Sequence, residues 1–403
     1  MRSNPAHLLI LAVTLLAPWS SATAENTGRP QIAPSLVNLD PGGSREFKID
    51  VGGRPATGVT WTVNDVPGGN STWGTITSSG LYKAPATAPK PREVHIHAIV
   101  SQPHKFHVWA TVIVGPGAPA YHLVSHWGEK GSGPGKFTDP HSLAFDRDHN
   151  LIITDALAGH VYRYTTDGKL LAEIGSGPGS DSAQFKGPRD VKVDAAGNIF
   201  VSDGDNHRIQ IFKPSGEFLR MFGQKGKEPG NMLRVHAIQF GPDGRLYAAD
   251  VDNSRIMVFD KSGKLLFEWG KDGRGPGEFH APHGLAGDAN GDIFVSNYWG
   301  SCQKFTADGK YLFEFAVPNE AVFTHAHAMA GDRWGNAYIM ARDKNNRSAI
   351  VKYNNNGTLV TTWPELKPAN DWGVKAALID DDGTLYAGVE SKGGVGIEIY
   401  REE

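Results

Sequence analysis

The sequence predicts an all-β protein in which a six-bladed β-propeller follows a small β-sandwich. Three observations lead to this prediction. The 403 residues include 49 glycines and 25 prolines, a composition that suits short strands joined by tight turns. A pattern recurs six times from residue 120 onward, at about the length of one propeller blade. Short runs of alternating apolar residues precede it, and a chain of this length is expected to form two folded units.

The repeat is marked by the residue that stands five positions before an Asp at the end of each first strand. Gly241 replaces that Asp in the third copy. The marked residues are His141, Arg189, His236, His283, His327 and Lys375, and subtraction of their numbers gives spacings of 48, 47, 47, 44 and 48 residues. In each copy further strands follow, among them the aromatic strands HRIQIF and SRIMVF.

The last copy ends at GIEIYREE after three strands, whereas YHLVSHWG at 121–128 resembles a fourth strand without a blade of its own. We expect this segment to complete the sixth blade, with Leu123, Val124 and Trp127 covering apolar partners. Closing the ring in this way removes the two sheet edges that an open array would expose.

Residues 1–24 have the features of a secretory signal peptide. Arg2 precedes an apolar run from Leu8 to Leu16, and small residues end the segment at Ala24. The run is short for a membrane span. We therefore expect cleavage before Glu25 and export to the periplasm or the cell exterior. The single cysteine, Cys302, excludes an intramolecular disulfide.

Residues 30–115 carry the alternating runs REFKIDV, VTWTV, EVHIHAIV and HVWATVIV between Gly- and Pro-rich turns, which predicts a small antiparallel sandwich. The stretch GVTWTVNDVPGGNSTWGTITSSGLYKAPA resembles bacterial immunoglobulin-like modules, which act as spacers or adhesive stalks. Residues 115–120 are the expected linker to the propeller, which would occupy 120–403.

The charge balance argues against two classes of partner. Lys and Arg total 40 against 43 Asp and Glu, without a basic stripe or polybasic tail. Nucleic acid and anionic membrane are therefore not expected partners. We expect a monomer that takes a small peptide-like substrate, or a peptide or protein ligand, in the propeller channel.

The histidines among the marked residues predict a metal site. The innermost strand of each blade lines the channel, and blades one, three and five lie at threefold positions around its axis. These blades supply His141, His236 and His327. Three imidazoles that leave a fourth position open are typical of a catalytic zinc. In the alternative interpretation, each histidine only bonds a neighbouring loop, and duplication has copied it between blades.

Two levels of resemblance extend this interpretation. SDGDNHRIQIFKPSGEFLRMFG resembles the NHL repeat, and the likeness covers 120–400. PHSLAFD and PHGLAGD, with ITDALAGHVYRY, resemble the peptidyl-α-hydroxyglycine α-amidating lyases, which are six-bladed NHL-type propellers. The resemblance implies zinc on His141, His236 and His327, an Arg and a Tyr that act on the substrate, and a structural calcium. Ala328 follows His327 where that family has an Asp beside calcium.

Further candidate residues follow from the same resemblance. Arg189 and Arg342 are candidates for the Arg, whose planar fork suits a substrate carboxylate. Asp205 stands where the family's Tyr would follow Ser-Asp-Gly, so Tyr298 is the candidate Tyr if the ring is read in rotated register. His283 is a candidate proton acceptor or substrate contact, and His325 is an alternative ligand to His327.

Two other functions remain open at this stage. The propeller could bind a peptide, glycan or protein without catalysis, since fold alone does not separate binding from catalysis. It could also be a lyase for another substrate, such as a cyclic ester antibiotic or a polyuronate.

Overall fold

The structure is a computed structural model that describes residues 28–402, except for 102–104, 118–120, 299–300, 317–322, 344–347, 365–372 and 392–393. At residues 316, 323–325, 327, 343, 364 and 391 only the backbone is described. The predicted signal peptide lies outside the described residues. Within them the chain forms β-strands and two 3₁₀ turns, η1 (Gly204–Asn206) and η2 (Val251–Asn253), and no helix has the length and apolar character needed to cross a membrane.

The chain before residue 115 forms three small sheets around one apolar core. The sheets are β1 (Pro30–Ala33), β4 (Lys48–Val51) and β5 (Arg54–Pro55); β3 (Ser44–Glu46), β10 (Leu81–Lys83), β9 (Gly74–Ile76) and β8 (Gly69–Asn70); and β2 (Leu36–Leu39), β12 (Phe106–Val114), β11 (Glu93–Val100), β6 (Val59–Val63) and β7 (Val66–Pro67). Phe47, Val63 and Tyr82 are fully buried in the shared core. Burial of such side chains holds the sheets together.

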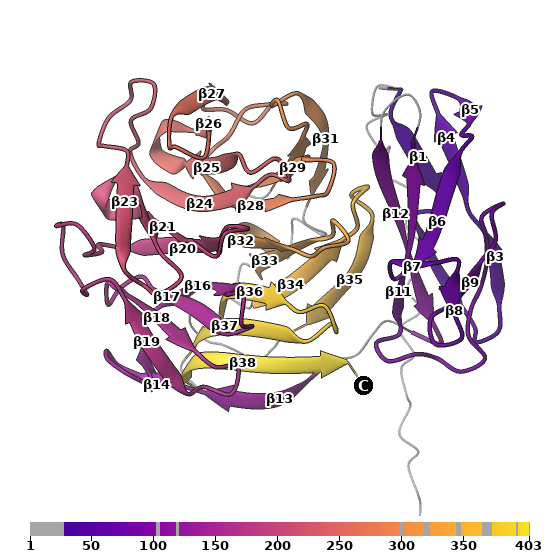
Figure 1. Ribbon diagram of the computed structural model, residues 1–403, viewed down its shortest axis with the longest axis horizontal. Helices are drawn as coiled ribbons and strands as arrows, with labels where there is room; N and C mark the ends of the chain where they lie inside the picture. The colour runs from indigo at the N-terminus through magenta and orange to yellow at the C-terminus, as the bar shows by residue number, and fades with distance from the viewer. Residues whose placement is uncertain are drawn as a thin grey trace, which may run out of the picture.

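Six four-stranded blades follow and confirm the predicted propeller (Figure 1). Blades one and two contain β16 (Pro140–Phe145), β17 (Leu151–Asp155), β18 (His160–Tyr164), β19 (Leu170–Ile174), then β20 (Pro188–Val193), β21 (Ile199–Asp203), β22 (Arg208–Phe212), β23 (Phe218–Phe222). Blades three and four contain β24 (Val235–Phe240), β25 (Leu246–Asp250), β26 (Arg255–Phe259), β27 (Leu265–Trp269), then β28 (Pro282–Gly287), β29 (Ile293–Asn297), β30 (Ser301–Phe305), β31 (Tyr311–Ala316). Blade five contains β32 (Phe323–Gly331), β33 (Ala337–Asp343), β34 (Ser348–Tyr353) and β35 (Leu359–Pro364).

Blade six closes the ring with a strand from each end of the propeller. Its strands are β36 (Val374–Ile379), β37 (Leu385–Ser391), β38 (Gly394–Glu402) and the outer strand β13 (Tyr121–Trp127), which precedes a short parallel pair, β14 (Glu129–Lys130) and β15 (Lys136–Phe137). β13 pairs antiparallel with β38, from Tyr121 opposite Glu402 to Trp127 opposite Ile397. The predicted closure is therefore confirmed.

The apolar contacts of β13 differ in part from those expected. Leu123 and Val124 are 42% and 47% exposed, because they lie on an outermost strand. The contacts come from its two ends instead. Trp127 packs 5.1 Å from the ring of Tyr164 in blade one, and Tyr121 lies 4.8 Å from the ring of Trp363 in blade five.

A buried Asp at the end of the second strand organises the first three blades. Asp155 accepts hydrogen bonds from the backbone amides of Thr138 and Asp139, at 2.8 and 2.9 Å. Asp203 and Asp250 accept equivalent bonds from the segments that lead into blades two and three. They also bind the Nε groups of Arg208 and Arg255, which begin the aromatic strands. The recurrent Asp is thus a structural element of these three blades.

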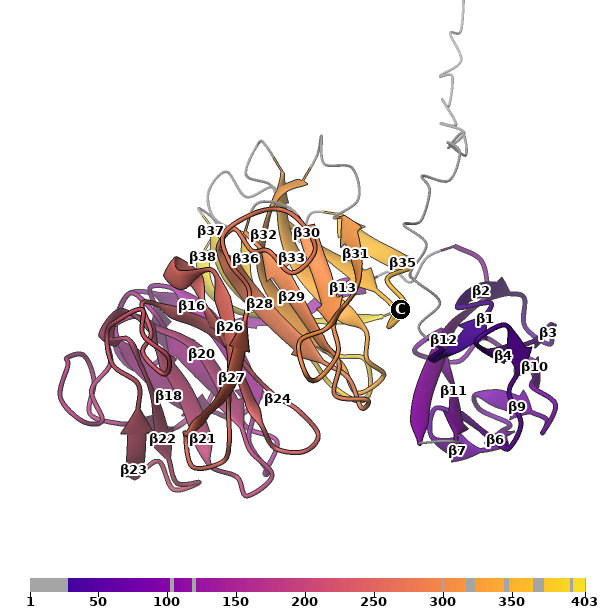
Figure 2. The same ribbon diagram turned by 90° about the horizontal axis from the view of Figure 1, so that it is seen from above.

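The N-terminal sheets lie beside the propeller (Figure 2). Glu93 forms a buried ion pair with Lys352 of blade five. His95 stacks on Trp334 with ring centroids 4.5 Å apart, and Arg29 contacts Asp292 at 2.9 Å. These contacts hold the two parts together, although the N-terminal sheets contribute no strand to any blade described.

Two truncations test the closure. Deletion of residues 1–115 should leave a folded propeller, because β13 is retained. Deletion of residues 1–129 removes β13, and the lost apolar burial, at roughly 25 cal/mol per Å², should cost several kcal/mol. We expect the shorter protein to aggregate or to melt far lower in calorimetry. Equal melting temperatures would show that β13 does not stabilise the ring.

Candidate functional site

Each of the six marked residues lies at a β-bulge in the innermost strand of its blade. The register shifts fall at Pro140/Ser142, Pro188/Asp190, Val235/Ile238, Pro282/Gly284, Ala326/Ala328 and Val374/Ala376. A bulge leaves one residue unpaired and changes the direction of its side chain. The repeat therefore reproduces one backbone device in every blade.

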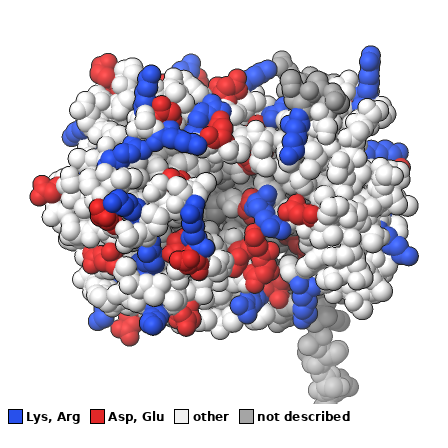
Figure 3. All heavy atoms as spheres, viewed as in Figure 1, with Lys and Arg blue, Asp and Glu red and all other residues white. Residues whose placement is uncertain are grey.

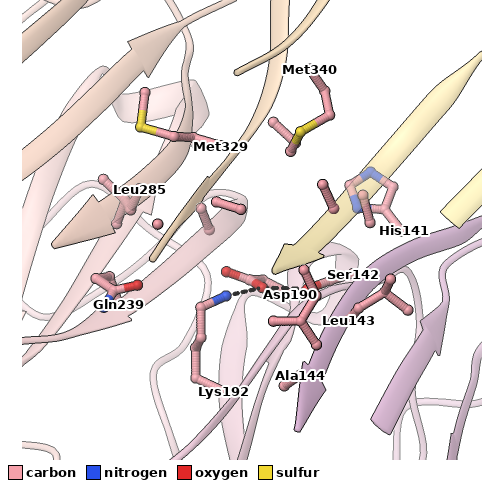
Figure 4. Close-up of a pocket in the computed structure, with 18 of the residues that line it drawn as sticks. His141, Ser142, Leu143, Ala144, Asp190, Lys192, Gln239, Leu285, Met329 and Met340 are labelled. Atoms are coloured by element: carbon pink, nitrogen blue, oxygen red, sulfur yellow. Dashed lines mark hydrogen bonds and ion pairs between the residues drawn. The ribbon is translucent and has the colours of Figure 1, made fainter. Parts of the chain in front are cut away.

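The bulges open onto a cavity in the middle of the propeller. Its volume is about 370 Å³, and its wall includes His141, Arg189, His236 and His283. Figure 3 shows the propeller hollowed at its centre. Farther along the inner strands the wall changes to Lys192 and Gln239 on one side and to apolar side chains, among them Leu285, Met329 and Met340, on the other (Figure 4).

Three imidazoles form a continuous row on this wall. The ring centroids of His141 and His236 are 4.9 Å apart, and those of His236 and His283 are 4.2 Å apart. Nδ1 of His141 lies 2.8 Å from the carbonyl oxygen of Arg189, and Nδ1 of His236 lies 3.0 Å from that of His283. Since a carbonyl only accepts, both Nδ1 atoms carry the hydrogen and both Nε2 atoms carry the lone pair. This tautomer is the one that binds metals through Nε2.

Burial disfavours the charged form of two of these imidazoles, His141 and His283. It lowers the pKa of His141, and the nearby positive charges of Arg189 and Lys375 lower it further, against the opposite influence of Asp139. Burial also lowers the pKa of His283 to about 4. Neutral imidazoles are electron-pair donors at neutral pH, as metal binding requires.

The structure describes the side chains of two of the three predicted metal ligands, His141 and His236. The backbone of His327 lies in β32 at the bulge of blade five, but its side chain and that of His325 lie outside the described part. Among the side chains that the structure describes, no three of His, Cys, Asp or Glu come together as a metal-binding group.

Two of the predicted catalytic side chains, Tyr298 and His283, lie side by side, and Arg342 is within electrostatic reach of Tyr298. The ring of Tyr298 lies 4.6 Å from that of His283. Burial lowers the pKa of Arg342, while the charges of Tyr298, Glu390 and Asp139 oppose this change, so all three are within electrostatic reach of its guanidinium. Tyr298 therefore lies beside the marked residue of its own blade.

Two of the six marked residues, Arg189 and Lys375, carry positive charges, and their surroundings differ. Arg189 is on the cavity wall and lies 3.8 Å from Asp205. The Lys375 ammonium lies 3.3 Å from both Asp139 and Glu390, and the residue is buried. The charge of Lys375 is therefore compensated by these two carboxylates.

Asp190 is a residue that sequence reasoning missed. Its carboxylate accepts hydrogen bonds from Ser142 Oγ at 2.6 Å, from Lys192 Nζ at 2.7 Å and from the backbone amide of Ile238 at 2.8 Å. It thus joins blades one, two and three close to His141 and His236. The sequence signal is weak, since none of the other five blades has an Asp after its marked residue.

Replacing Asp190 should loosen this junction. Asp190→Ala leaves buried donors unsatisfied, at about 1–3 kcal/mol each, so we expect a loss of roughly 3 kcal/mol or more in the free energy of unfolding. Urea denaturation measures it. Asp148→Ala, at an exposed turn of blade one, should stay within about 0.5 kcal/mol of the unaltered protein. Similar free energies of unfolding for both variants would show that Asp190 does not stabilise the junction of the three blades.

Comparison with known proteins supports the assignment of residues in this region to a β-propeller. Residues 185–212 match the family model described as NHL repeat, and residues 232–362 match the one described as 6-bladed beta-propeller. A solved structure from Bacteroides thetaiotaomicron, described as a structural genomics protein of unknown function, has a TM-score of 0.56. It is 15% identical in sequence, and the match covers 93% of this chain and 97% of that chain, so the fold is shared.

Among curated relatives, peptidyl-glycine alpha-amidating monooxygenase A of Xenopus laevis is 36% identical over 123 residues, which cover 28% of this chain and 13% of that protein. A probable peptidyl-alpha-hydroxyglycine alpha-amidating lyase of Caenorhabditis elegans is 31% identical over 112 residues, or 26% and 32% of the two chains. NHL repeat-containing protein 3 of Mus musculus is 33% identical over 126 residues, or 29% and 34%. The chain thus matches about a third or less of the length of each.

Proposed function

We propose that this protein is an exported, zinc-dependent lyase that converts a peptidyl-α-hydroxyglycine to a peptide amide and glyoxylate. The observation that supports it best is the pair His141 and His236. They come from alternate blades, their rings touch, and each has Nδ1 fixed on a backbone carbonyl. The partial sequence similarity to an amidating monooxygenase and to a probable amidating lyase points to the same chemistry.

The proposed zinc ligands are His141, His236 and His327. The described part of the site fits a zinc ion in the chemistry of its donors, because the imidazoles of His141 and His236 have the hydrogen-bonded Nδ1 that zinc-binding histidines usually show. Zinc, when bound, would supply a Lewis acid that stabilises negative charge developing on the substrate hydroxyl oxygen. We do not propose a calcium site, because Ala328 offers no side-chain oxygen next to His327.

The reaction needs a base, a carboxylate-binding cation and a proton for the leaving nitrogen. The base removes the hydroxyl proton, the carbon–oxygen double bond of glyoxylate forms, and the carbon–nitrogen bond breaks with its electron pair going to nitrogen. That nitrogen takes up a proton and becomes the peptide amide. Arg342 or Arg189 would hold the substrate carboxylate with two parallel hydrogen bonds. Tyr298, whose ring contacts that of His283, would transfer the proton in this proposal.

We also propose that the N-terminal sheets form an immunoglobulin-like spacer and that residues 1–24 direct export. The spacer would hold a monomeric propeller at a fixed orientation, which the buried Glu93–Lys352 ion pair and the His95–Trp334 stack support. A small peptide-like substrate would occupy the channel.

Zinc content provides the first test. Protein purified without chelator should contain about one equivalent of zinc by elemental analysis. His236→Ala should lose most of it, because a three-ligand site tolerates the loss of a ligand badly. His283→Gln is the matched control and should keep its zinc. Zinc-free unaltered protein from several preparations would refute the metal proposal.

Glyoxylate release from N-benzoyl-α-hydroxyglycine provides the second test. Tyr298→Phe should lower kcat by about a hundredfold or more if the phenol transfers the proton, with zinc content unchanged. Tyr311→Phe in the outer strand of the same blade should retain full activity. If the zinc-loaded protein releases no glyoxylate above the uncatalysed rate, the amidating reaction is wrong, and a binding propeller or another substrate becomes the better proposal.

A further inference from the structure

Beyond the histidines, the channel has a polar side and an apolar side. The polar side chains come from blades one, two and three, and the apolar wall that faces them comes from blades four, five and six. The polar residues are Ser142, Asp190, Lys192 and Gln239. The apolar wall includes Leu285, Met329, Met340, Ala376 and Ala377 (Figure 4). A ligand in this part of the channel therefore meets different chemistry on its two faces.

The charges in this part of the channel are compensated. Lys192 Nζ lies 2.7 Å from Oδ1 of Asp190. At the far end, Asp332 accepts hydrogen bonds from two backbone amides of its own turn, at 2.9 and 3.0 Å, and lies 3.9 Å from Lys352 Nζ. A charged ligand group would lose its hydration here without gaining a counter-ion, which is costly. The arrangement therefore favours a neutral ligand.

The polar side still offers one hydrogen-bond donor and one acceptor. An ammonium group has three N–H bonds. Lys192 directs two of them to Asp190 Oδ1 and to the carbonyl oxygen of Val191, at 2.7 and 3.3 Å. Gln239 donates from Nε2 to the carbonyl oxygen of Phe240, whereas no residue in the described part of the chain donates to its Oε1. The remaining donor and acceptor, on neighbouring blades, match the C=O and N–H of a peptide group.

Two methionines make the apolar side adaptable. Met side chains are unbranched, flexible and polarizable, so they fit apolar groups of different shapes and contact aromatic rings favourably. The small residues Ala376 and Ala377 beside them leave room at the wall. The cavity of about 370 Å³ lies at the lower end of the range of about 300–1,000 Å³ for ligand sites. It therefore suits one large apolar side chain rather than several.

The spacing along the inner strands relates these two sides to the histidines. Lys192 and Gln239 each stand three residues beyond the marked residue of their blade. At about 3.3 Å per residue this is about 10 Å, the length of roughly three extended residues. With the α-hydroxyglycine at the histidines, as proposed above, the residue before it lies between the two sides of the channel.

We propose that the channel selects substrates in which a large apolar residue precedes the α-hydroxyglycine. The side chain of that residue contacts Met329 and Met340, and its own amide group bonds Lys192 and Gln239. This inference rests on the proposed function and names the class of peptide that the same site accepts.

The kcat/KM values of the full chain for N-acetyl-phenylalanyl-, N-acetyl-alanyl- and N-acetyl-glutamyl-α-hydroxyglycine test the selection. We expect the phenylalanyl substrate to exceed the alanyl one at least tenfold, and the glutamyl substrate to be the slowest. Met329→Gln keeps the side-chain length and should bring the ratio of the first two close to one, with unchanged zinc content. Met221→Gln, at an exposed position of an outer strand, is the matched control and should keep the ratio. Equal kcat/KM values for all three substrates would overturn the selection and leave the lyase proposal intact.

A binding measurement without turnover separates this inference from the proposed function. N-acetyl-phenylalanylglycine lacks the hydroxyl group, and in calorimetric titration it should bind at least tenfold more tightly than N-acetyl-alanylglycine. Gln239→Leu, which also serves if Met329→Gln does not fold, should remove most of its advantage over 3-phenylpropanoylglycine, which has the same ring but no acetamido group. If this preference is found while no substrate releases glyoxylate, the amidating reaction is wrong and the channel selectivity stands. Equal binding of the phenylalanyl and alanyl compounds would overturn the selectivity.

Discussion

The antiparallel pairing of β13 with β38 is the contact on which the rest of the structure depends. It joins residues 121–127 to residues 394–402 and makes the sixth blade four-stranded. A closed ring fixes the distances across the channel, where the rings of His141 and His236 meet. The aromatic contacts of Tyr121 and Trp127 with the blades on either side strengthen this closure.

Within the closed ring, the β-bulges determine which side chains of the inner strands face the channel. Each bulge interrupts the ladder of its blade at the marked residue, while the strand beyond it keeps its regular alternation and apolar packing. The backbone carbonyls of neighbouring marked residues then orient the imidazoles: the carbonyl of Arg189 binds His141, and that of His283 binds His236. One irregularity thus provides both the direction and the tautomer of the side chain.

Two cavities of the structure differ in chemistry because their surroundings differ. The channel wall carries buried imidazoles with lowered pKa values, which are neutral donors suited to a metal. A second cavity of about 420 Å³, between the N-terminal sheets and the propeller, is lined instead by six acidic and four basic side chains, and burial raises the pKa of its Glu402 despite the contacts with Arg92.

The sequence by itself determined the number of blades, the need for a strand near residue 121 to complete the last one, and the equivalence of His141, Arg189, His236 and His283. These features can be read from the sequence because each blade repeats the same residue pattern. Only the tertiary structure decided that Tyr298 approaches His283, that Lys375 is held by Asp139 and Glu390, that Asp190 joins three blades, and that Glu93 meets Lys352. Asp190 and Ser142 are 48 residues apart, and Glu93 and Lys352 are 259 apart. Such contacts depend on ring closure and on packing between the two parts of the chain, which no local pattern encodes.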